Sequence, residues 1–564
     1  MSLLPGEKLR YAETHFKFKL PWSLLYKPWP EIIVDAPFQF VPGVKPTLWI
    51  VVRDADRFPT TIKSAKIVLE HIAECDGMCF EKTQAQNAPQ PNISIERNLD
   101  IEAQEQMQFF ELPLGQIPAG TYHAHCTLTV ERDGQSQTFN RWNLPRLKPE
   151  PLRFKVLNEA PPIAPGYAAG EMHCHTHYSA DHVEYGASPA VLQQAAKAVG
   201  LDFVSCTDHA YDFAFTQEDY TKEAPSPVPR FQNLRDEIAS LPRQTENGDP
   251  LPLLLAGEEV SAGNSKGENV HMTALAPDGY LPGLGDCGRY WLDNKPTRTI
   301  KQILNSTEAH CFAAHPFQQM GLLEKFVFRR GYWKPEDLNI AGKHPVRGIQ
   351  FWNGVRDEGF KLGREFWINE LGKGNYLLPI GGNDAHGDLN SMTAVSLPLL
   401  SLKHTRAHIF GNVRTVVKVG SRKSEVGCNK PEASEPYSVT PHSLRGHHTQ
   451  SLLSLDDINA AFAGDNCYIT DGPALWWERN GKNLVFHARS NKETGGGFRY
   501  IRIFRRRLLP NGKSAPNEEI DIGSLIATPD HADIPVATTG FAYFRAECET
   551  ATGKFALTSA AKVF

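Results

Sequence analysis

The residues best suited to chemistry in this chain are histidines and carboxylates at or just beyond the ends of predicted strands. They occur in or near six short motifs between residues 173 and 386, namely HCHTHYS, TDH, GEEVS, NVHM, AAHP and NDAH. The candidate ligands are His173, His175, Asp181, His209, Glu259, His271, His315, Asp384 and His386. Buried polar groups are costly unless they are paired or bound to an ion, so this concentration predicts a metal site.

The ligand types restrict the metal and its neighbours. Nitrogen and oxygen ligands without thiolate suit zinc, manganese or iron. Alternate residues of a strand share one face, so His173 and His175 point the same way and Cys174 points into the packing. Cys174, Cys206 and Cys311 all lie in predicted strands and are interpreted as core residues or as residues directly behind the ligands.

The elements that must position these ligands are predicted strands separated by helical segments. The seven predicted strands are GEMHCH, LDFVSCT, LPLLLAGEEV, NVHMTALA, HCFAAH, RGIQFWN and NYLLPIGG, and six of them finish on or near a candidate ligand. A helix is predicted between the first two, with Ser188 as N-cap, Pro189 in the first turn and Gly200 as its stop. Repeated strand–helix units favour a parallel β/α barrel, whose carboxyl-terminal strand ends converge on one active site.

The ordered series GEMHCHTHYS, GLDFVSCTDH, LAGEEVS, NVHMTAL, AAHP and GGNDAHG resembles the PHP (polymerase and histidinol phosphatase) superfamily of metal-dependent hydrolases over residues 170–388. The resemblance implies a distorted seven-stranded β/α barrel. Together with the patterns of the flanking regions, the predicted fold class is a multidomain α/β protein in which this barrel is flanked by N-terminal and C-terminal β-sandwich domains. It also implies three divalent transition metals, each zinc, manganese or iron.

Carried over to this sequence, the resemblance implies three ligand sets. One metal is held by His173, His175, Glu259 and Asp384, a second by Glu259, His271 and His315, and a third by Asp181, His209 and His386. The loop after Ser179 departs from the usual Asp-Gly, so His182 or Glu184 remains an alternative to Asp181. Glu258 neighbours Glu259, but the Gly-x-Glu spacing favours Glu259.

The flanking regions carry different patterns. Residues 1–165 contain short alternating stretches that predict a β-sandwich, residues 166–475 hold the barrel, and residues 476–564 predict a second β domain. The segment 420–450 is polar and aperiodic and is predicted to be a flexible loop. His123 and His125 form a His-x-His pair without a neighbouring ligand motif, and a polar strand face is the favoured interpretation.

Composition excludes several functional classes. The chain has 564 residues and a formal net charge of −5, as expected for an ordinary globular protein with no basic surface for nucleic acid. No export signal, membrane-length apolar run or disulfide framework is evident, which favours a cytoplasmic protein.

The predicted reaction is hydrolysis of a small phosphorylated molecule by a metal-bridging hydroxide in a trinuclear centre. Glu259 and Asp384 are the catalytic candidates, and a metal-bound water or His177 is the proton donor. Asp208 is assigned an orienting or substrate role. Lys266 and Arg330 are candidates for phosphate binding. Two alternatives remain open: hydrolysis of a carbamate, ester or amide by the same metals, and a metal-stabilised binding protein without catalysis.

Overall fold

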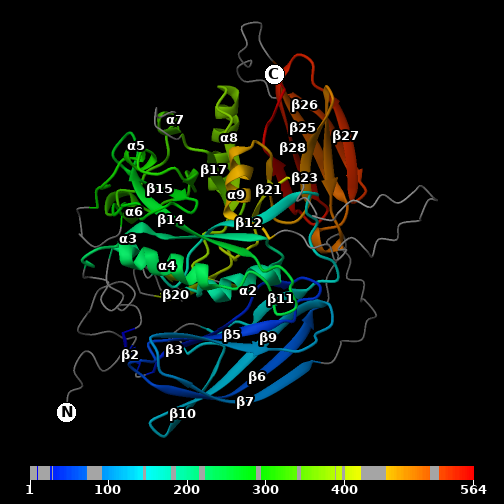
Figure 1. Cartoon of the computed structure of the whole chain (residues 1–564). Coiled ribbons are helices and arrows are strands. Elements are labelled where there is room, and N and C mark those ends of the chain that lie inside the picture. Colours follow the sequence, from blue (N-terminus) through cyan, green and yellow to red (C-terminus); the bar gives the residue numbers. More distant parts are fainter. Residues whose placement is uncertain are drawn as a thin grey trace, which may run out of the picture.

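The computed structural model describes residues 9–10, 26–27, 29–72, 92–143, 148–179, 186–214, 223–286, 294–338, 345–387, 389–390, 392–396, 401–420, 452–507 and 520–563. Strands dominate these residues. Figure 1 shows the N-terminal strands (blue to cyan) at the bottom, the helix-bearing middle region (green) at the upper left and the C-terminal strands (orange to red) at the upper right.

The N-terminal strands form two sheets around one apolar core. The three-stranded sheet has the order β3-β5-β8, and the six-stranded sheet has the order β4-β11-β9-β6-β7 with β10 paired to β9. Ile50 from the first sheet and Ile67 and Leu128 from the second lie in the same buried cluster. The bounds are β3 Glu31–Asp35, β4 Gln39–Phe40, β5 Thr47–Arg53, β6 Thr60–Ile72, β7 Ile93–Ala103, β8 Met107–Pro113, β9 Gly120–Arg132, β10 Gln135–Asn140 and β11 Leu152–Val156; β1 (Leu9–Arg10) pairs with β2 (Tyr26–Lys27).

The middle region contains the seven strands expected from its apolar runs. They are β12 Tyr167–Cys174, β13 Phe203–His209, β14 Leu253–Gly263, β15 Asn269–Ala274, β16 Cys311–Ala314, β17 Gly348–Asn353 and β18 Leu378–Gly382. The helices of this region are α2 Pro189–Val199, α3 Ala210–Phe213, α4 Val228–Ser240, α5 Ile300–Leu304, α6 Leu322–Phe326, α7 Pro335–Leu338 and α8 Glu358–Gly372. A separate hairpin pairs β19 (Met392–Ser396) with β20 (Ser401–Thr405).

The predicted helix between the first two strands is confirmed. Helix α2 begins after Ser188, whose hydroxyl accepts a hydrogen bond from Val191 N at 3.3 Å. It ends at Gly200, whose φ of +82° is the left-handed conformation that glycine adopts without a Cβ clash. Local capping therefore fixes both ends of this helix.

The prediction of a distorted seven-stranded β/α barrel flanked by separate β-sandwiches is wrong. The seven strands form one half of a 14-stranded sheet with the order β18-β17-β16-β15-β14-β13-β12-β21-β22-β29-β28-β25-β26, and β30 pairs with β28. The added strands are β21 Arg414–Lys418, β22 Cys467–Thr470, β25 Phe498–Arg507, β26 Ile520–Thr528, β28 Phe541–Thr550, β29 Phe555–Thr558 and β30 Ala561–Lys562. The C-terminal strands thus extend the sheet that carries the candidate ligands.

Two local features break the strand–helix repeat. Strand β15 is antiparallel to both β14 and β16. Its pairing with β14 follows from the short connection between them (264–268), a tight turn in which Asn264 N donates to Glu268 O at 2.9 Å. A parallel crossover needs about a dozen residues or more, so this connection is too short for a helix. Of the described helices in the middle region, α3, α5, α6 and α7 are each only four or five residues long.

The remaining C-terminal elements cover one end of the large sheet. Strands β23 (Ala474–Asn480), β24 (Asn483–Arg489) and β27 (His531–Ala537) form a three-stranded sheet. Leu475 and Phe486 of that sheet share a buried cluster with Ile501 and Phe544 of the large sheet. Helix α9 (Leu455–Ala463) and the 3-10 turn η1 (Lys492–Thr494) complete the described elements. None of the described helices is long and apolar enough to span a membrane.

The large sheet curls so that the residues after β18 meet the end of β12. Asp384 N donates to His173 O at 2.7 Å, and His175 N donates to Ala385 O at 2.7 Å. Glu171 fixes this junction, because its fully buried carboxylate accepts hydrogen bonds from His173 N at 3.1 Å, Asn383 N at 2.9 Å and Gly411 N at 3.0 Å. Burial raises the pKa of Glu171 to about 7, although these hydrogen bonds oppose the rise.

The N-terminal sheets hold the segment that follows His386. Asp35 of β3 accepts a hydrogen bond from Leu389 N at 2.5 Å, and burial raises its pKa to about 6 although Arg141 opposes the rise. Asn390 exchanges two hydrogen bonds with the backbone of Arg153 in β11, at 3.2 and 2.8 Å. This contact joins the N-terminal region to the end of the ligand-bearing sheet.

We expect Asn390→Ala to lower the free energy of unfolding by about 2 kcal/mol, because it leaves buried hydrogen-bonding groups without partners. Urea and thermal unfolding measure this change. Asn98→Ala, at an exposed position of β7 in the same N-terminal region, is the matched control and should change stability little. Equal changes in the free energy of unfolding for the two substitutions would contradict a stabilising role for the Asn390 hydrogen bonds.

Candidate metal centre

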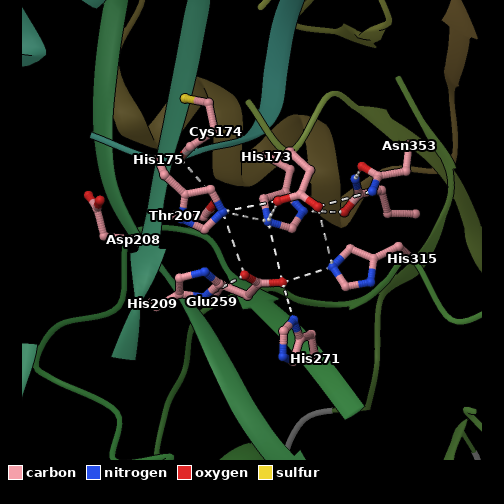
Figure 2. A network of polar contacts seen from close by, with 12 residues as sticks. His173, Cys174, His175, Thr207, Asp208, His209, Glu259, His271, His315 and Asn353 are labelled. Carbon is pink, nitrogen blue, oxygen red and sulfur yellow. Dashed lines mark hydrogen bonds and ion pairs between the residues drawn. The ribbon is translucent and has the colours of Figure 1, made fainter. Parts of the chain in front are cut away.

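The carboxylate of Glu259 lies at the centre of the candidate site. Glu259 belongs to β14, is 1% exposed, and is surrounded by imidazoles from β13, β15 and the end of β16 (Figure 2). Its Oε1 atom lies 2.7 Å from His271 Nδ1 and 2.9 Å from His315 Nε2. Its Oε2 atom lies 2.8 Å from His209 Nδ1.

Asp384 and the His-x-His pair form the adjoining part of the site. Asp384 Oδ1 lies 3.1 Å from His175 Nε2 and 3.3 Å from His173 Nε2. The two imidazole Nε2 atoms are 3.2 Å apart, and His173 Nε2 is also 3.4 Å from Glu259 Oε1. The junction between β12 and β18 therefore brings two strand ends together that are more than 200 residues apart in the chain.

Three groups of ligand atoms, each within 4.8 Å of one another, could hold a metal ion. Two have the predicted membership: His173, His175, Glu259 and Asp384, and Glu259, His271 and His315. The third unites His209 and His386 with His175. The predicted ligand Asp181 and its alternatives His182 and Glu184 lie outside the described residues. The first group shares Glu259 with the second and His175 with the third, so the three groups form one continuous cluster.

The charges of the cluster fit divalent cations. Burial favours neutral carboxyl groups, but His271 and His173 hold the pKa of Glu259 well below its usual range, and His173 does the same for Asp384. Burial lowers the pKa of His173, yet Glu259 and Asp384 outweigh it and raise the pKa to about 9. Burial lowers the pKa of His175 and His315, which favours the neutral imidazole that binds metals.

Groups outside the cluster orient its imidazoles. His173 Nδ1 lies 2.8 Å from Gln350 Oε1, and because an amide oxygen only accepts, Nδ1 carries a proton and Nε2 is the nitrogen that would bind a metal. Asp208 accepts a hydrogen bond from Ser179 Oγ at 2.8 Å, and Ser179 Oγ lies 3.2 Å from His175 Nδ1. Asp208 thus contacts the cluster through Ser179, in agreement with an orienting role.

Strand β17 supplies residues that the sequence motifs did not reveal. Besides Gln350, it carries Asn353, whose Nδ2 donates to Asp384 Oδ2 at 3.1 Å (Figure 2). RGIQFWN is the one predicted strand without a candidate ligand, and its polar Gln and Asn within an apolar run were the available signal. Asp286 lies outside β17, in a turn between β15 and α5, and is a third residue near the cluster that no sequence motif revealed.

Two ligand positions adopt an unusual backbone conformation. His315 has a φ of +25° and Asp384 has a φ of +53°, values in the left-handed region that residues with a Cβ occupy rarely. Such conformations cost on the order of 1–3 kcal/mol each and cluster at functional sites. Both strand ends therefore turn sharply to direct a side chain into the cluster.

A cavity of about 20 Å³ adjoins this cluster. His271, His315, Arg330 and Trp333 are among its lining residues. Arg330 Nε donates to Asp286 Oδ2 at 2.5 Å, so its guanidinium lies next to the candidate ligands. Lys266, the other predicted phosphate contact, is exposed in the 264–268 turn and does not line this cavity.

Other candidates lie apart from the metal groups. His177 stacks on Tyr178 and has its Nε2 atom 3.5 Å from Glu237 Oε2, so it lies beside the cluster rather than within it. Glu258 points to the opposite side of β14 and accepts a hydrogen bond from Leu281 N at 2.7 Å. His123 and His125 lie on the outer face of β9, where His125 is near Glu70.

No protein-family model and no curated protein sequence matches the chain. Among solved structures, a β-D-mannosidase from Dictyoglomus thermophilum aligns over 96% of this chain and 67% of its own, with 9% identity and a TM-score of 0.20. A β-glucuronidase from Parabacteroides merdae aligns over 96% and 79%, with 8% identity and a TM-score of 0.18. Likenesses at these scores establish neither a shared fold nor a shared activity.

We expect the gently purified protein to carry more than two equivalents of transition metal per chain, because three ligand groups share one cluster. Elemental analysis measures the content. His123→Ala combined with His125→Ala removes two imidazoles on the outer face of β9 that could bind metal adventitiously, and this variant should retain the full content. A wild-type protein that is metal-free and gains no activity with added manganese or zinc would contradict the assignment.

Proposed function

We propose that the protein is a metal-dependent hydrolase, and most specifically a phosphoesterase acting on a small phosphorylated molecule. The observation that carries the proposal is the sharing of Glu259 by two candidate metal groups, with Arg330 in the adjoining cavity. The ordered ligand motifs support the further proposal that the chain is related to the PHP superfamily.

The metals would be held by the three groups described above. Divalent ions held by these residues would lower the pKa of bound water and would neutralise the oxygens of a phosphoryl group. Glu259 supports this chemistry by fixing His271 and His315 on one side and His209 on the other. Asp384, oriented by Asn353, supplies the second buried negative charge.

Arg330 is proposed to bind an oxyanion of the substrate. A guanidinium presents N–H donors in a planar fork that matches phosphate oxygens. Arg330 lines the same cavity as His271 and His315, so an oxygen bound there lies between the guanidinium and the metal ligands. A phosphate monoester carries the negative charge that such a site requires, whereas a carbamate does not.

His177 is proposed to hold the proton that the leaving group receives. Glu237 lies 3.5 Å from its Nε2 atom and also accepts a hydrogen bond from the Tyr178 hydroxyl at 3.0 Å. The neighbouring carboxylate orients the imidazole of His177. Phe109 of the N-terminal strand β8 packs beside the same imidazole, with ring centroids 6.4 Å apart.

Glu259→Gln and Asp384→Asn should each reduce turnover at least about 100-fold while the far-ultraviolet circular dichroism stays unchanged, since each removes a charge from the cluster without removing volume. Steady-state kinetics measure the loss. The control is the His123→Ala, His125→Ala double variant, which should keep wild-type turnover. If the control lost as much activity as either cluster variant, the chemistry would lie outside the middle region.

The reaction class is tested with a chromogenic phosphate monoester, a phosphodiester and an aryl carbamate. We expect the metal-loaded protein to prefer a phosphate ester, and Arg330→Ala to lower its kcat/KM at least about tenfold by removing a charge-assisted contact. Carbamate turnover should be much less affected. Carbamate hydrolysis well above both phosphates, with Arg330→Ala nearly unaffected, would transfer the assignment to carbonyl hydrolysis.

A further inference from the structure

Asp286 is a fully buried carboxylate that contacts both a candidate metal ligand and the candidate anion-binding residue. Its Oδ2 atom lies 2.9 Å from His271 Nε2 and accepts a hydrogen bond from Arg330 Nε at 2.5 Å. Its Oδ1 atom accepts a hydrogen bond from Ser261 Oγ at 2.5 Å. Three donors from separate segments of the chain therefore converge on one side chain.

The turn that carries Asp286 is pressed against β15. A Cβ at Gly285 would lie 1.8 Å from Asn269 Oδ1, so only glycine permits this approach. The turn is also bridged to β14 through Ser261 and Leu284. Backbone packing thus sets the position of Asp286 independently of any ligand.

Asp286 determines which nitrogen of His271 faces the cluster. Because an ionised carboxylate only accepts hydrogen bonds, the Nε2 atom of His271 carries the proton that points at Asp286. The Nδ1 atom points into the cluster, 2.7 Å from Glu259 Oε1, and would offer its lone pair there once a metal ion takes the place of the proton that this second carboxylate attracts. This is the arrangement in which a carboxylate orients a metal-binding imidazole.

The same oxygen of Asp286 also anchors Arg330. The guanidinium lies in the cavity lined by His271 and His315, and its Nε atom is directed toward Asp286. A long side chain with several rotatable bonds loses entropy when it binds an anion, and prior anchoring reduces that loss. Asp286 thus contacts metal-binding and anion-binding groups with one carboxylate.

We propose that Asp286 is a positioning residue that couples metal retention at His271 to oxyanion binding at Arg330. This inference rests on the proposed function, because inorganic phosphate is chosen as the probe on the assumption that the substrate is a phosphate ester. It extends that function by assigning one residue two separable effects, one on the metal and one on the anion.

The test compares Asp286→Asn with Asp337→Asn in the full-length metal-loaded protein. Asp337 is the matched control, because it is equally buried and accepts hydrogen bonds from Ser265 N at 2.7 Å and Lys334 N at 2.8 Å, neither of which belongs to the cluster. Metal retention is measured by chelator competition, and phosphate affinity by calorimetry. Asp286→Asn should weaken each by about tenfold or more, and Asp337→Asn should leave both within about twofold of wild type.

Double-mutant cycles separate positioning from general destabilisation. The metal effect of Asp286→Asn should disappear in a His271→Ala background, and its phosphate effect should disappear in an Arg330→Ala background. Additive effects in either cycle, loss of only one property, or equal losses in Asp337→Asn would overturn the coupling. A wild-type protein that retains no metal would overturn both proposals, whereas the expected shifts without ester turnover would overturn the phosphoesterase alone.

Discussion

The buried carboxylate of Glu171 holds together the two strand ends on which the rest of the site depends. It accepts backbone hydrogen bonds from the segments that carry His173 and Asp384, and from the turn before β21. These bonds keep the curled sheet in register where β12 meets the end of β18. An apolar residue at this position would leave three buried N–H groups unpaired, at a cost of about 1–3 kcal/mol each.

The curl of the sheet brings the histidines and carboxylates of the candidate site together. Residues of the surrounding segments then orient the imidazoles. Gln350 orients His173, Ser179 and Asp208 orient His175, and Asp286 orients His271. The neutral or charged state of each ring follows from how burial balances against Glu259 and Asp384. A site with two buried carboxylates and six imidazoles therefore depends on groups that do not themselves belong to it.

The N-terminal region participates in this arrangement. Asp35 and Arg153 hold the segment directly after His386, and Phe109 packs beside His177. These contacts give the two N-terminal sheets a physical role in placing one end of the cluster. They also mean that a middle region isolated from them would lose partners for the buried Asn390.

The sequence by itself determined the strands of the middle region, the caps of α2 and the candidate ligands, because apolar runs, capping residues and motif spacing are local signals. The pairing of Glu259 with His271 and His315 was also expected, although only from a family resemblance. Tertiary structure alone decided that β15 runs antiparallel and that β21 and β22 continue the sheet into the C-terminal strands. Strand pairing and the positions of Gln350, Asn353 and Asp286 depend on contacts between segments far apart in the chain, and hydrophobic periodicity carries no information about which strands become neighbours.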